Sequence, residues 1–104
     1  MEHAVIAYLP LTESSFGSER ERMIVADLAG KLEKTIREHD IGEFDGEEFG
    51  GGQCVIYMYG RDADLLFAAV EPILRATPLA TGGVVIKRYG EAEDLGAAEV
   101  RVDL

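Results

Sequence analysis

The sequence predicts an α+β domain whose elements follow the order strand, helix, strand, strand, helix, strand. Three short runs are rich in β-branched and other apolar residues, a fourth is acidic, and each run ends at a glycine or a proline. Two longer segments between them carry apolar residues at every third or fourth position, which is typical of amphipathic helices. The chain has 104 residues, a length that suits one compact domain.

The first two elements are a strand and a long helix. Residues 4–9 are apolar and β-prone, and Pro10 ends the run. Ser18 stands three residues before Glu21, a spacing at which both side chains can satisfy free amides at a helix start. The apolar stripe that follows consists of Val25, Leu28, Ala29, Leu32 and Ile36. This pattern predicts a helix over 19–38, and Gly42 just beyond it fits the helix end.

The next segment reads as a hairpin. Residues 41–49 include four acidic residues and two glycines, whereas residues 53–59 are almost entirely apolar. Three glycines, Gly50 to Gly52, separate the two runs and favour a turn with positive backbone angles. We therefore expect an acidic arm at the edge of a sheet and a second, central arm.

The rest of the core contains a second helix and a fourth strand. Asp62 can cap a helix whose apolar side includes Leu66 and Val70, and Thr77 with Pro78 ends it. Residues 84–89 form the fourth strand. The acidic remainder ends in residues 99–103, whose alternation permits a short fifth strand or a tail that packs on the sheet edge. We therefore predict one domain over 1–104, with a core over 1–90 and a C-terminal extension over 91–104.

This order of elements is the split βαβ, or ferredoxin-like, arrangement. Right-handed crossovers place both helices on one face of a four-stranded antiparallel sheet, with or without a short C-terminal fifth strand. The other face stays open.

The open face is the first candidate site, because the central strands are apolar on both sides and one covered face does not account for that pattern. We assign the tyrosines to the open side, since a phenol tolerates a partly wet interface. The cover would be a second copy of the protein, a ligand or the C-terminal segment. The predicted interaction residues on this face are Tyr8, Tyr57, Tyr59, Val85, Lys87 and Tyr89.

The second candidate site is the acidic arm of the hairpin. Glu43, Asp45 and Glu47 occupy alternate positions, so their carboxylates are expected on one side of the strand. Such a row can block edge-to-edge aggregation, bind a basic patch on a partner protein, or hold a divalent cation. No calcium-loop spacing supports the last of these, so no metal residue is predicted.

Composition excludes several classes of function. The chain has 20 acidic and 10 basic residues and a net charge of -10, which repels phosphate backbones, so we expect no nucleic acid partner. No apolar run is long enough to span a membrane, and the start is unlike a signal peptide, so we expect a cytoplasmic protein. The single cysteine, Cys54, is expected to be a buried, inert thiol. No motif predicts a catalytic residue or a cofactor.

Several motifs together are similar to those of a group of small bacterial proteins of unassigned function. They include the stretch from Gly42 to Gly46, the glycines 50–52, the run 57–60, the segment 62–67 and the run 87–90. The resemblance covers about half of the chain. It implies a bacterial, cytoplasmic origin and brings no catalytic motif.

Three hypotheses of function follow. The first is a non-catalytic interaction or regulatory domain that forms a homodimer through its open sheet face. The second is an acidic protein, similar to immunity proteins or antitoxins, that binds a basic partner through its acidic edge. The third is a small enzyme of the dimeric α+β-barrel type, for which Tyr57, Tyr59, Lys87 and Cys54 are the residues to test.

Overall fold

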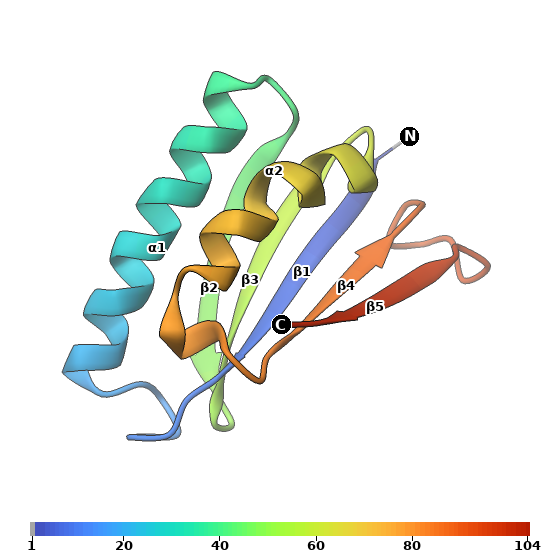
Figure 1. The fold of residues 1–104 in the computed structure, drawn as a ribbon. Coiled ribbons are helices and arrows are strands. Elements are labelled where there is room, and N and C mark those ends of the chain that lie inside the picture. The colour runs from blue at the N-terminus through green and yellow to red at the C-terminus, as the bar shows by residue number, and fades with distance from the viewer. Residues whose placement is uncertain (1) are drawn as a thin grey trace.

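The computed structural model describes residues 2–104 and shows two layers, a sheet and a pair of helices that cover one of its faces (Figure 1). The strands are β1 (His3–Pro10), β2 (Glu43–Gly50), β3 (Gln53–Gly60), β4 (Val84–Arg88) and β5 (Glu99–Asp103). The helices are α1 (Glu19–Glu38), α2 (Ala63–Arg75) and the short 3-10 helix η1 (Pro78–Ala80).

The sheet is antiparallel, with the strand order β2-β3-β1-β4-β5. Its first four strands and both helices follow the predicted element order, which is consistent with a ferredoxin-like arrangement. The sheet has five strands rather than four, because residues 99–103 pair with the free edge of β4. This pairing satisfies backbone groups that β4 would otherwise present to water at an edge. The C-terminal segment thus widens the sheet and does not cover its open face.

Helix α1 begins at the capping box that the sequence predicts. The Ser18 hydroxyl accepts a hydrogen bond from the Glu21 amide at 3.0 Å, and the Glu21 carboxylate accepts one from the Ser18 amide at 3.0 Å. One stripe of the helix is buried against the sheet, namely Val25, Leu28, Leu32 and Ile36. Exposed i,i+4 ion pairs such as Lys31 with Asp27, 3.0 Å apart, lie on the outer side.

Replacing Ser18 with Ala is expected to lower the free energy of unfolding by about 1 kcal/mol, because it removes the side-chain acceptor for a free amide of the first turn. Chemical denaturation followed by circular dichroism measures this loss. Ser15→Ala is the matched control, since Ser15 precedes the helix and is exposed. Equal stability of the two variants would contradict the capping role.

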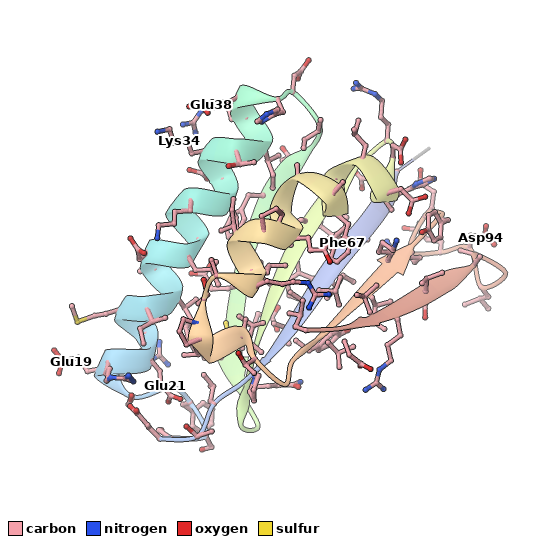
Figure 2. All side chains as sticks on the ribbon, viewed as in Figure 1. Glu19, Glu21, Lys34, Glu38, Phe67 and Asp94 are labelled. Atoms are coloured by element: carbon pink, nitrogen blue, oxygen red, sulfur yellow. The ribbon has the colours of Figure 1, made fainter. Side chains whose placement is uncertain are left out.

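The core lies between the sheet and the helices. From the strands it takes alternate residues, such as Val5, Ala7 and Leu9 of β1, which are fully buried. Helix α2 contributes Leu66, Phe67, Val70 and Leu74. Figure 2 shows Phe67 on the side of α2 that faces the sheet. These contacts fix which face of each strand points toward the helices.

Candidate functional site

The register of the sheet defines the residues of the face that the helices leave uncovered. Val5, Ala7 and Leu9 of β1 point into the core, so Ala4, Ile6 and Tyr8 point to the opposite face. Residues directly opposite each other in an antiparallel pair share a face. The partners of Ala4, Ile6 and Tyr8 on β3 and β4 therefore belong to the open face as well.

Four strands contribute three rows of side chains to this surface, which we call the tyrosine face. Each row runs across β2, β3, β1 and β4 in that order. The first row is Glu43, Tyr59, Ala4 and Arg88; the second is Gly46, Tyr57, Ile6 and Ile86; the third is Glu48, Val55, Tyr8 and Val84. Strand β5 extends the three rows beyond β4, because Glu99, Arg101 and Asp103 pair with Arg88, Ile86 and Val84. The centre of the face is therefore apolar, and charged groups lie at both of its lateral borders.

The tyrosine face contains three of the predicted interaction residues, Tyr8, Tyr57 and Tyr59, but not the predicted residues of β4. Val85 pairs with Ala7 and is fully buried in the core, and Lys87 pairs with Val5. Their assignment to the open face was wrong, because the alternate residues of β4, such as Val84 and Ile86, point to that face instead. In an apolar strand such as β4, the pattern alone does not distinguish the two faces.

Lys87 and Tyr89 instead connect the fourth strand to α2. The Lys87 Nζ lies 2.9 Å from Oδ1 of Asp64, and the Tyr89 hydroxyl donates a hydrogen bond to the same oxygen. The bond from Tyr89, followed by that from Lys87, lowers the pKa of Asp64, and the bond to Asp64 raises the pKa of Lys87. We assign this cluster a role in holding β4 against α2.

His3 also supports this end of α2, a contact that sequence reasoning missed. Its Nδ1 accepts a hydrogen bond from the Ala63 amide at 3.1 Å, and its ring meets the Tyr89 ring edge-on at 5.6 Å. An amide donor requires an unprotonated Nδ1. Residues sixty positions apart make the bond, so no local pattern could have revealed it.

The acidic arm does not carry its carboxylates on one side. The register shifts between Phe44 and Gly46, so a bulge at Asp45 interrupts the alternation of β2. Glu43 pairs with Tyr59 on the open face, whereas Glu47 pairs with Ile56, whose side chain points into the core. The prediction of a single row formed by Glu43, Asp45 and Glu47 was therefore wrong.

Two signals in the sequence could have revealed the bulge. Phe44 and Phe49 both pack against the core, although an odd separation of five places them on opposite faces of a regular strand. Gly46, with a φ of 110°, supplies a backbone conformation that other residues rarely adopt.

Two tyrosines of the open face, Tyr57 and Tyr59, are partly shielded, and the pKa of each phenol is raised. Burial is the main cause that raises the pKa of Tyr57, and Glu48 acts in the same direction. Burial likewise raises the pKa of Tyr59, with Asp45 adding to the effect. The phenols therefore present rings and neutral hydroxyls rather than charges.

A hollow of about 310 Å³ lies at the end of the face where the first row runs. Tyr59 and Arg88 line it together with five acidic residues, Glu2, Glu43, Asp45, Glu91 and Glu93. The Arg88 Nε donates to the Gly90 carbonyl at 2.9 Å. Arg88 is thus a cation surrounded by acids of its own chain and held at one border of the tyrosine face.

A larger hollow of about 470 Å³ is bordered by Pro10, α1 and η1. Its acidic groups already have partners. Glu21 accepts hydrogen bonds from the amides of Thr12 and Ser18, and Glu13 pairs with Arg20 at 3.0 Å. These bonds hold the loop that enters α1, and Figure 2 shows Glu21 at that end of the helix.

The four residues proposed for an enzyme do not meet. Tyr57 and Tyr59 lie on the open face, Lys87 is bound to Asp64, and Cys54 is fully buried on the helix side. Burial, with a contribution from Glu47, raises the pKa of the Cys54 thiol to about 12. A thiol in this state is not a nucleophile at neutral pH, which agrees with the predicted inert cysteine.

The described residues thus define a small α+β protein with one exposed, mainly apolar sheet face. Comparison with family models, with curated proteins and with solved structures gives no match, in keeping with a resemblance that brings no assigned family. Within residues 2–104, no three acidic, histidine or cysteine side chains are placed to hold a metal ion. No helix in this range is long and apolar enough to cross a membrane.

Proposed function

We propose that this chain is a small, non-catalytic interaction domain that acts as a homodimer, with the tyrosine faces of two copies packed against each other. The observation that supports this proposal most is the uncovered centre of the face. Ile6 lies between Tyr57 and Ile86, all three are partly exposed, and no element of residues 2–104 packs over them. Apolar sheet faces are stabilised when a second layer excludes water from them.

A second copy is the favoured cover for the tyrosine face because the C-terminal segment already forms part of the sheet. Strand β5 pairs with β4 in the plane of the sheet, so it cannot also lie across it. The hollow that borders the face lies at one end and is lined mainly by acids. A flat face of this kind suits another sheet, which packs at about 10 Å, better than a small molecule.

The size of the face sets the expected affinity. Four strands at about 4.8 Å spacing and six residues at about 3.4 Å each give a patch of about 400 Å² per copy. Two copies would bury about 800 Å², below the roughly 1,200–2,000 Å² of standard stable complexes. We therefore expect a dissociation constant in the micromolar range, about 1–100 μM, rather than a permanent dimer.

Replacing Ile6 with Glu is expected to raise the dissociation constant of the dimer about tenfold or more, because a charge at the centre of the face would be desolvated on association. Sedimentation equilibrium of the purified protein over about 1–200 μM, a range set by the expected affinity, measures this constant. Circular dichroism verifies that the variant is folded.

Met23→Glu is the matched control, since Met23 is 67% exposed on the outer side of α1. It adds the same charge and should leave the dissociation constant unchanged. A wild-type protein that remains monomeric at about 100 μM would overturn the proposal without any variant.

The alternative of a basic partner at the acidic edge is less favoured, because the bulge at Asp45 divides the carboxylates of β2 between two faces. A divided row offers weaker charge complementarity than a continuous one.

A further inference from the structure

We infer that the two copies pack with their strands aligned, related by a twofold axis that runs parallel to the strands between β1 and β3. This inference rests on the proposed function and specifies the geometry of that interface. Its basis is the distribution of charge and side-chain size over the three rows of the tyrosine face.

An axis in this position places β2 of one copy over β4 of the other and β3 over β1, with each row facing its equivalent. In the first row, Glu43 then lies opposite Arg88 of the second copy, and Arg88 lies opposite its Glu43. The twofold symmetry therefore produces two such ion pairs in each dimer. Opposite charges at the border of an interface fix its register and speed association.

Side-chain size is complementary at three of the six facing pairs in the same arrangement; the other three are the ion pair, Tyr57 with Ile6, and Glu48 with Val84. Tyr59 faces Ala4 of the second copy in the first row, and Gly46 faces Ile86 in the second. In the third row, Tyr8 faces Val55. Alternating large and small residues allow two sheets to interdigitate at normal packing density.

Two other twofold arrangements of the same faces bring like charges together. An axis perpendicular to the strands places the first row over the third, so that Glu43 meets Glu48 of the second copy. An axis centred on β1 places β2 over β5, so that Glu48 meets Asp103. Both arrangements would be disfavoured by repulsion in a partly desolvated interface.

Arg88 also has the geometry for this role. Its Nε donates a hydrogen bond to the Gly90 carbonyl, which holds the guanidinium in place, and none of the ion pairs within residues 2–104 involves Arg88. The guanidinium fork can bind a carboxylate through two parallel hydrogen bonds. Acids of its own chain surround Arg88, and Glu99 is its cross-strand neighbour, so Glu43 of the second copy would add a facing carboxylate to this cluster.

The test uses two charge-reversing variants. Each is expected to weaken dimer association on its own, and a mixture of the two is expected to restore it. Glu43→Arg places two cations opposite each other, and Arg88→Glu places two anions opposite each other. Each variant alone is expected to raise the dissociation constant about tenfold. An equimolar mixture of the two restores both opposite-charge pairs in the heterodimer, so its dissociation constant should return close to that of the wild type.

Asp27→Lys and Lys31→Asp form the control pair, because these residues make an exposed ion pair on α1 and carry the same changes of charge. Neither variant, nor their mixture, should alter association. The milder variants Glu43→Gln and Arg88→Gln serve if a reversal impairs folding. Combined in one chain, they should raise the dissociation constant no more than either change does alone.

The outcomes separate this inference from the proposed function. If the wild type dimerises but mixing the two charge-reversed variants does not restore its dissociation constant, the aligned arrangement is overturned and the proposed homodimer is not. A strictly monomeric wild type would overturn both.

Discussion

Replacing Gly42 with Ala is expected to lower the free energy of unfolding by about 3 kcal/mol, the upper end of what overpacking costs. A side-chain carbon at this position would overlap the carbonyl oxygen of Tyr59, a rigid backbone atom. Gly60 has the reciprocal problem, because its side-chain carbon would overlap the carbonyl oxygen of Ile41. The two glycines let the start of β2 pass close to the end of β3.

Thermal unfolding followed by circular dichroism measures the effect, and roughly 12–20 °C of the melting temperature should be lost in a domain of this size. Gly30→Ala is the matched control. Gly30 lies within α1, where nothing approaches the added carbon within 4 Å, so alanine should stabilise the helix by about 0.5–1 kcal/mol. The same glycine-to-alanine substitution is therefore expected to lower the free energy of unfolding at residue 42 and to raise it at residue 30. A Gly42→Ala protein as stable as the wild type would contradict the close approach.

The second large effect is expected at Glu21, which is 2% exposed. Its carboxylate accepts hydrogen bonds from the amides of Thr12 at 2.9 Å, Glu13 at 3.3 Å and Ser18 at 3.0 Å. Glu21→Ala leaves these three part-buried donors without their common acceptor. Its loss in melting temperature should be at least about twice that of Ser18→Ala, because three amides rather than one lose their acceptor.

The same carboxylate makes stability depend on pH. The bond from the Ser18 amide is the largest cause that lowers the pKa of Glu21 below its ordinary value of 4.5, against the opposing effect of burial. A folded-state pKa below the unfolded value stabilises the protein above pH 4.5, and this contribution is lost as pH falls through the folded pKa. Melting temperatures measured from pH 7 to about 3 should therefore fall less steeply in Glu21→Gln than in the wild type. Equal slopes would contradict the role of the ionised group.

Local sequence patterns predicted the elements well, because their signals lie within a few residues of one another. The capping box of Ser18 and Glu21 marks the start of α1, and the stripe from Val25 to Ile36 gives its length. The glycine turn between β2 and β3 likewise has a local cause. Gly42 is a partial exception. It was expected to end the helix, but Asp40 takes the left-handed conformation there, with a φ of 50°, and Gly42 serves the approach to β3.

The faces of the strands were harder to predict than the strands themselves. A strand that is apolar on both sides, such as β4, carries no internal mark of which side meets the helices. Lys87 was assigned to the open side together with the tyrosines, but it lies on the helix side, where Asp64 on α2 neutralises it. The bulge at Asp45 has the same consequence for β2, because one extra residue exchanges the two faces beyond it.

By itself, then, the sequence determined the order of helices and strands, the excess of negative charge and the presence of more apolar sheet surface than two helices can cover. The tertiary structure alone decided that β5 joins the edge of the sheet, that Val85 and Lys87 point toward the helices, and that Glu43 and Arg88 border the same open face. The physical reason is that helix caps and turns depend on neighbours in the chain. Which face of the sheet each side chain of a strand points to depends instead on hydrogen bonds to residues far away in the sequence.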